Sequence, residues 1–91
     1  MTLNEKLIAL LMDPLSHGNS MRTSDYYEYL KTNGLCSGSK FSDELDFHLR
    51  YLLRQKRISN SDGLHTMEGI GFHGANQQYI MLDQWLVGST G

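Results

Sequence analysis

Residues 39–59 read SKFSDELDFHLRYLLRQKRIS, and this stretch decides the fold that the sequence predicts. Its large apolar side chains are Phe41, Leu45, Leu49, Leu52 and Leu53. They recur at spacings of four, four, three and one, which is the period of a helix that buries one face. We therefore expect a helix over about residues 39–56, followed without a linker by a short strand-like segment, Arg57–Ser59.

Two shorter helices are predicted before this stretch. The first covers residues 3–12 and ends at Asp13-Pro14, because the residue before a proline is pushed out of the helical region. The second begins at a cap among residues 23–25 and ends at Asn33-Gly34, where the glycine can take the left-handed conformation. Only residues 35–38 then precede the third helix, so the second and third helices are expected to be in close contact, as in a helix-turn-helix.

A hairpin with a long loop is predicted after the third helix. Residues 60–77 contain too many glycines for a regular element. Residues 78–82 favour a β-strand, which is expected to pair antiparallel with residues 57–59. Residues 83–87 are expected to form a final helical turn, and residues 88–91 a disordered tail.

Length and composition indicate one small domain over residues 1–87. The 91 residues are 40% hydrophobic and 20% charged, and the formal net charge is -2. This charge argues against a protein that coats nucleic acid by bulk attraction, although it allows a local basic patch. The single cysteine, Cys36, cannot form an intrachain disulfide, so a reducing cytoplasm is the simpler location. The first helix is too short to span a bilayer, and no membrane association is expected.

The predicted order of elements resembles that of a winged helix-turn-helix domain. The residues that carry the resemblance are Phe41, Leu45, His48, Leu49, Leu52, Gln55–Ile58 and Tyr79–Met81. They look like the family's recognition helix with inward leucines, a sharp exit into a strand, and a wing. The expected fold class is mainly α with a small antiparallel β-hairpin (α+β), that is, three helices followed by a two-stranded wing. The resemblance implies a DNA-binding transcriptional regulator with the third helix in the major groove, as in many small phage-, plasmid- and bacterium-encoded regulators.

The candidate DNA contacts gather at and around the third helix. Half of the lysines and arginines lie within residues 50–57. The full candidate set is Lys40, Ser42, Phe47, Arg50, Arg54, Lys56 and Arg57. The cations are expected to contact phosphates, and Ser42, Phe47 and Arg50 to face the groove together with two acids, Asp43 and Asp46. A purely structural alternative remains open, because cations also complement the dipole at a helix C-terminus.

An acidic cluster supports a second function. Asp43, Glu44 and Asp46 open the third helix, and no lysine or arginine lies between Ser59 and Gln84. The same scaffold would then be a protein-protein interaction module, for example a phage-encoded inhibitor of a host nucleic-acid enzyme. For either function we expect a homodimer through the first helix, because Leu7, Ile8, Leu10 and Leu11 spread over more than one helix face.

No motif for catalysis or cofactor binding is present. The chain lacks a phosphate-binding glycine loop with lysine, a G-x-S-x-G elbow and an H-E-x-x-H pair. The possible metal ligands are Cys36, His17, His48, His65 and His73. None of them has the close spacing of a structural zinc site. We therefore expect no enzyme activity, no cofactor and no bound metal, with His48 packed in or beside the core.

Overall fold

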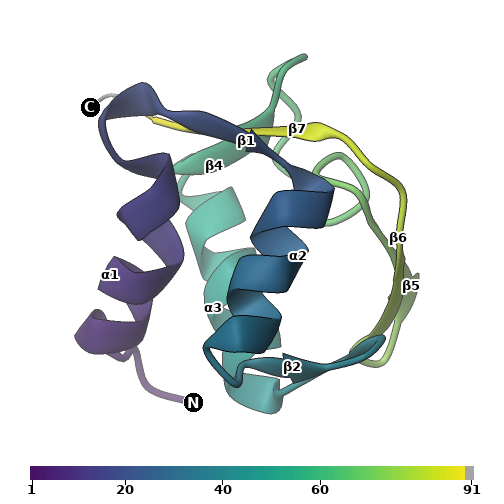
Figure 1. Ribbon diagram of the computed structural model, residues 1–91. Helices are drawn as coiled ribbons and strands as arrows, with labels where there is room; N and C mark the ends of the chain where they lie inside the picture. Colours follow the sequence, from purple (N-terminus) through teal and green to yellow (C-terminus); the bar gives the residue numbers. More distant parts are fainter. Residues whose placement is uncertain (90–91) are drawn as a thin grey trace.

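Three α-helices and seven short strands make up residues 1–89, the part of the chain that the computed structural model describes (Figure 1). The helices are α1 (Glu5–Met12), α2 (Thr23–Thr32) and α3 (Asp43–Arg54), and a 3₁₀ segment, η1 (Asp13–Gly18), follows α1. The strands are β1 (Ser20–Arg22), β2 (Cys36–Ser37), β3 (Lys40–Phe41), β4 (Ile58–Asn60), β5 (Phe72–Ala75), β6 (Gln78–Met81) and β7 (Trp85–Gly88).

The strands form two antiparallel sheets. One has the order β1-β7-β4, and it runs across the upper ends of the helices in Figure 1. The other has the order β2-β3-β6-β5, and its β5-β6 hairpin stands to the right of α2 and α3 in the same view. This α+β arrangement differs from the predicted three helices with a two-stranded wing, and the winged helix-turn-helix fold class is therefore wrong.

The predicted wing fails because its two strands pair with other partners. β4 pairs with β7, for example Ser59 opposite Val87, and not with β6. Residues 85–88, expected as part of a helical turn and a tail, instead form the central strand of the first sheet, with Leu86 fully buried. A third strand with a buried face makes this sheet far more stable than an isolated hairpin would be.

The long loop contains a hairpin that the sequence did not reveal. β5 and β6 are joined by Asn76 and Gln77, whose φ angles are 54° and 67°. Two consecutive left-handed residues are the geometry of a type I′ turn, which matches the twist of the flanking strands. Because the second position is glutamine rather than glycine, the usual sequence signal for this turn is absent.

The link between α2 and α3 is also longer than predicted. Residues 33–42 contain the small β2-β3 hairpin, and Lys40 of β3 pairs with Gln78 of β6. The link therefore joins the second sheet instead of forming a four-residue turn. α3 begins only at Asp43, where the Ser42 hydroxyl accepts a hydrogen bond from the Leu45 N–H at 3.0 Å.

The core forms around the inward face of α3, as the apolar spacing predicts. Leu45, Leu49 and Leu52 are fully buried, and Phe41 and Leu53 are nearly so. The apolar side chains of α1 join the same core: Leu7, Ile8, Leu11 and Met12 are all buried. The expectation that α1 has a spare apolar face for a dimer is therefore wrong, since only Leu10 is left half-buried.

The end of the described chain is tied to the first sheet. Gly88 is the last residue of β7, and the Ser89 N–H donates to the Arg57 carbonyl at 3.0 Å. These two residues are thus ordered, whereas the sequence placed them in a tail; residues 90 and 91 of that tail lie outside the described part. None of the helices in residues 1–89 combines the length and the apolarity that a bilayer crossing needs.

Candidate functional site

The outward side of α3 carries separated charges. Asp43 and Glu44 are exposed in its first turn, and Arg50 and Arg54 are exposed near its end. This distribution complements the helix dipole, which is positive at the N-terminus and negative at the C-terminus. Asp43 and Glu44 thus lie at the opposite end of the helix from Arg54, whereas Asp46 and Arg50 are one turn apart.

Arg50 is held by two neighbours. Its Nε donates to an Asp46 carboxylate oxygen at 3.1 Å, and a terminal nitrogen donates to the Tyr79 hydroxyl at 2.6 Å. Tyr79 in turn donates its O–H to Asp46. The bond to Tyr79 raises the pKa of Arg50, and burial raises the pKa of Tyr79. Asp46 therefore neutralises Arg50 locally, and the network fastens β6 to α3.

Three other cations lie free at the end of α3. Arg54, Lys56 and Arg57 are exposed, and none forms an ion pair among residues 1–89. They sit on a fixed backbone turn, because the Lys56 N–H donates to Leu53 and the Arg57 N–H to Leu52, at 3.0 and 2.9 Å. This is a Schellman motif, in which the first residue after the cap takes a positive φ. We call Arg54, Lys56 and Arg57 the basic turn.

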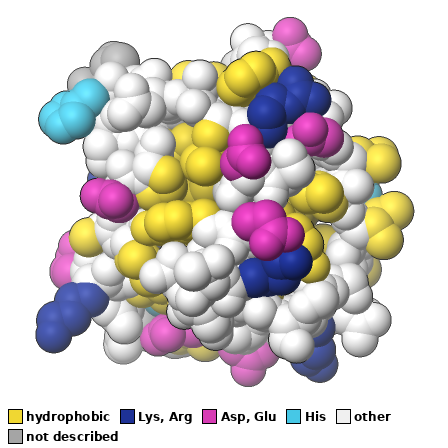
Figure 2. All heavy atoms as spheres, viewed as in Figure 1, with side chains coloured by type: hydrophobic (Ala, Val, Ile, Leu, Met, Phe, Trp, Pro, Cys, Tyr) yellow, Lys and Arg dark blue, Asp and Glu magenta, His cyan; other side chains and the backbone are white. Residues whose placement is uncertain are grey.

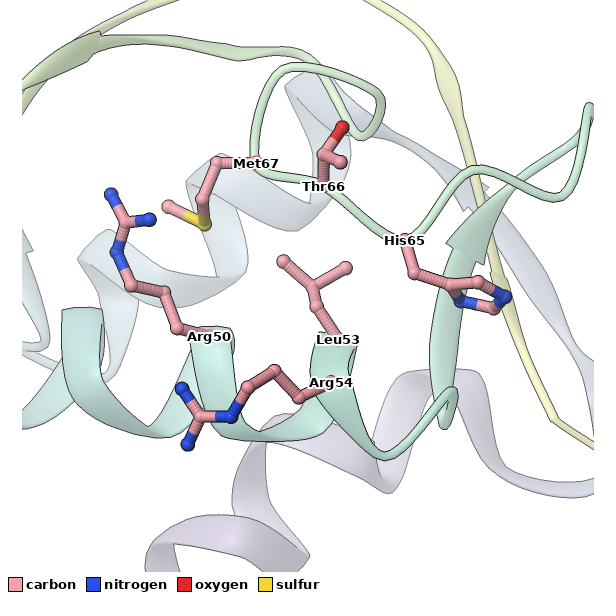
Figure 3. Close-up of a pocket in the computed structure, with 6 residues that line it drawn as sticks. All are labelled: Arg50, Leu53, Arg54, His65, Thr66 and Met67. Carbon is pink, nitrogen blue, oxygen red and sulfur yellow. The ribbon is translucent and has the colours of Figure 1, made fainter.

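A pocket adjoins the basic turn. Its volume is about 280 Å³, and it lies between α3 and the loop of residues 65–67. Figure 3 shows Leu53 pointing up from α3 toward the space below Met67, with Arg50 and Arg54 extending on one side. Leu53 and Met67 are buried and form an apolar floor, while the two guanidinium groups stand at the rim. Such a site suits an anionic group attached to an apolar body.

The loop side of the pocket supplies groups that sequence reasoning missed. The His65 Nδ1 lies 3.0 Å from the Ile58 carbonyl and donates to it, which leaves the other ring nitrogen free to bond elsewhere. Thr66 accepts a hydrogen bond from the Gly69 N–H at 2.9 Å. No sequence signal marks these residues, because the pocket depends on how the irregular loop packs over α3.

The remaining predicted contacts lie away from the basic turn. Lys40 is exposed in β3, before the start of α3. Arg54 is the last residue of α3, whose 12 residues span roughly 18 Å. Ser42 is occupied as the N-cap, and Phe47 is half-buried with its ring edge-on to His48 at 5.1 Å. The structure thus brings together Arg54, Lys56 and Arg57 but leaves these three residues at the other end or on the flank of the helix.

His48 has a structural role. It is fully buried; its Nε2 accepts the Asn4 N–H at 2.9 Å, and its Nδ1 donates to the Glu44 carbonyl at 2.8 Å. Both ring nitrogens are used, so the expectation of a packed core histidine is confirmed. In residues 1–89, no three His, Cys, Asp or Glu side chains lie close enough to share a metal ion.

Comparison with known proteins adds no relative. No model of a known protein family matches the chain, and neither curated proteins nor solved structures show a significant similarity to it.

Proposed function

We propose that this protein binds duplex DNA through the basic turn at the end of α3. The observation that carries the proposal is the group of three exposed, unpaired cations on one hydrogen-bonded turn, Arg54, Lys56 and Arg57. Cations that have no internal partner are the ones that can replace counterions on phosphates. Contacts of this kind position a protein on the duplex without reading its sequence.

The acidic start of α3 determines how the helix would approach DNA. Asp43 and Glu44 are exposed and would be repelled by phosphates if the whole helix lay along the groove. In the proposed complex the C-terminal end of α3 therefore meets the backbone, and the first turn points away from it. Arg50 adds little charge, because Asp46 already neutralises it.

A protein partner at the acidic residues has weaker support. The notion requires Asp43, Glu44 and Asp46 to act together on a basic surface. Asp46 is half-buried and engaged with Arg50 and Tyr79, so only Asp43 and Glu44 remain free. Two exposed acids in the first turn of a helix are explained by the helix dipole alone.

Salt titration of DNA binding tests the proposal. A labelled duplex of random sequence is titrated with the protein, starting at about 50 mM salt and rising to about 200 mM. Three phosphate contacts predict a slope of about -3 for the logarithm of the binding constant against the logarithm of salt concentration. Failure to bind at the lowest salt, or binding without a salt slope, would refute DNA binding.

A charge-matched pair of variants locates the contact. Arg54→Ala with Arg57→Ala is expected to weaken binding and to reduce the slope by about 2. Lys6→Ala with Lys31→Ala removes the same charge from exposed positions on α1 and α2 and should leave the slope unchanged. If both double variants weaken binding equally, the basic turn is not the site.

A further inference from the structure

The pocket beside the basic turn is largely unused by the proposed contact with DNA. Its volume of about 280 Å³ is close to the lower limit of ligand pockets, which is about 300 Å³. Two arginines line it, and no aspartate or glutamate does. Arg54 is the one residue that the lining shares with the basic turn. The pocket can therefore have a small ligand of its own.

The inner part of the pocket is apolar. Leu53 and Met67 are 3% and 6% exposed, and Figure 3 shows them facing each other, one from α3 and the other from the loop above it. The His65 ring and the Thr66 hydroxyl are turned away from Leu53 in the same view, and each forms a hydrogen bond with the backbone. An apolar group therefore finds a matching surface between α3 and the loop, and a methionine side chain adapts readily to the shape of such a group.

The rim of the pocket is cationic. Arg50 and Arg54 are one helical turn apart, and Figure 3 shows both guanidinium groups on the same side of Leu53. Arg50 uses two of its five N–H donors, one on Asp46 and one on Tyr79, which leaves three for a ligand. These two bonds also hold the guanidinium in place, so little side-chain freedom is lost when a ligand binds to it.

Acidic side chains do not cancel the charge of this rim. Asp46 neutralises Arg50, but Arg54 forms no ion pair among residues 1–89 and keeps its full charge. The acids of the neighbouring loop, Asp62 and Glu68, line a different pocket. The face that carries α2 differs, because Figure 2 shows cationic and acidic side chains next to each other there. The rim can therefore attract an anion.

The floor and the rim together indicate the chemical class of the ligand. A guanidinium group binds a carboxylate or a phosphate through two parallel hydrogen bonds. A bare inorganic anion would leave the apolar floor uncovered, and a hydrocarbon would leave the rim without a partner. A ligand with an anionic head and an apolar body matches both parts of the pocket.

We infer that this pocket binds a small organic anion, a carboxylate or a phosphate attached to an apolar body. Arg50 and Arg54 hold the anionic head, and Leu53 and Met67 contact the apolar body. An occupied pocket is expected to withdraw Arg54 from the basic turn, and this consequence alone rests on the proposed DNA binding. The site itself is tested without DNA, so its failure and the failure of DNA binding are distinguishable.

A series of four small molecules tests the site. Hexanoate and hexyl phosphate carry both parts of the ligand, hexanol carries the apolar body alone, and acetate carries the head alone. Each is titrated to about 50 mM at constant ionic strength while the methyl signals of Leu53 and Met67 are followed by NMR. Ligands of about eight to ten non-hydrogen atoms are expected to bind with dissociation constants on the order of 1–10 mM. Hexanol and acetate should bind at least about three-fold more weakly than hexanoate, and the tighter of the two amphiphilic anions identifies the head group.

A matched pair of variants tests the rim. Arg54→Gln is expected to weaken hexanoate binding about three- to ten-fold and to leave hexanol binding unchanged, because this residue contacts only the charged head. Arg57→Gln removes the same charge from a residue that does not line the pocket, and it should change the affinity for hexanoate less than about two-fold. Methyl signals of Leu53 and Met67 that do not move at the highest concentration of either amphiphilic anion would overturn the inference. Hexanol that binds as tightly as hexanoate, or equal losses in the two variants, would overturn it as well.

Discussion

At the scale of one residue, Lys56 of the candidate site has a backbone conformation that residues other than glycine rarely adopt. It follows the cap of α3 with a φ of 59°, a conformation in which glycine is the favoured residue. A side chain there costs about 1 kcal/mol or more of backbone strain. Residues held in such conformations cluster at functional sites, and a cation kept at this position agrees with the proposed contact with phosphate.

Lys56→Gly is expected to change the stability of the protein and its affinity for DNA in opposite directions. Glycine removes the strain, so the free energy of unfolding should rise by up to about 1 kcal/mol. The loss of one cation should weaken DNA binding and reduce the salt slope by about 0.9. Chemical denaturation and DNA titration of one protein preparation measure both effects. A variant that is more stable and binds as well as the wild type would remove Lys56 from the site.

Residue-level prediction succeeded where a side chain acts within its own helix. The inward leucines and the core position of His48 follow from helix periodicity. Ser42, expected to face the groove, instead caps α3, whose start lies later than residue 39. The left-handed conformation of Lys56 could not be predicted, because lysine does not favour a positive φ. The pocket at His65 could not be predicted either, because the sequence of a glycine-rich loop does not determine how the loop packs over α3.

At the scale of elements, the β5-β6 hairpin depends on contacts with α3 and β3 for its stability. Besides its backbone pairing with β3, two side-chain contacts hold it: the Tyr79–Asp46–Arg50 network and an aromatic cluster in which Phe41 lies 5.0 Å from Phe72 and 4.9 Å from Tyr79. Two-stranded hairpins are marginal alone, so these contacts to α3 and β3 support it.

Tyr79→Phe is expected to loosen the hairpin. The ring and its packing remain, but Arg50 and Asp46 lose the hydroxyl that joins them to β6. A hydrogen bond to a charged group contributes about 1.5–3 kcal/mol, so exchange of the β5 and β6 amide hydrogens should accelerate at least about ten-fold. Tyr51→Phe removes a hydroxyl elsewhere on α3 and serves as the control. Unchanged exchange in β5 and β6 would show that aromatic packing and the pairing with β3 hold the hairpin without the Tyr79 hydroxyl.

Strand pairing is the level at which sequence reasoning failed. Residues 78–82 and 85–88 are both β-favouring, and nothing local determines which of them pairs with β4. The choice is made by long-range burial, since Leu86 fills the core from β7 while Ile80 of β6 stays in solvent. Helices were easier to predict because the hydrogen bonds and apolar period of a helix are internal to one segment.

At the scale of the whole molecule, the last strand joins the segment that follows α1 in the first sheet. β7 pairs with β1 on one side and β4 on the other, and Figure 1 shows this last strand running alongside β1. The Gly88 N–H donates to the Asn19 carbonyl at 3.0 Å, just after η1. Closure of this sheet therefore requires the segment after α1 and the last strand to be in place together, which makes the fold cooperative.

Closure of the first sheet is expected to be most sensitive to a substitution at Gly88. A β-carbon built on Gly88 would lie 1.9 Å from the Leu15 carbonyl oxygen, and backbone on both sides cannot move aside without opening the sheet. Gly88→Ala is therefore expected to cost about 3 kcal/mol or more of unfolding free energy, the upper part of the range for overpacked sites. Gly34→Ala is the control: its β-carbon meets nothing within 4 Å, and only its φ of 70° is unfavourable. That substitution should cost about 1–2 kcal/mol. Urea denaturation measures both variants, and equal losses would mean that the strand and η1 are not in the close contact on which closure of the sheet depends.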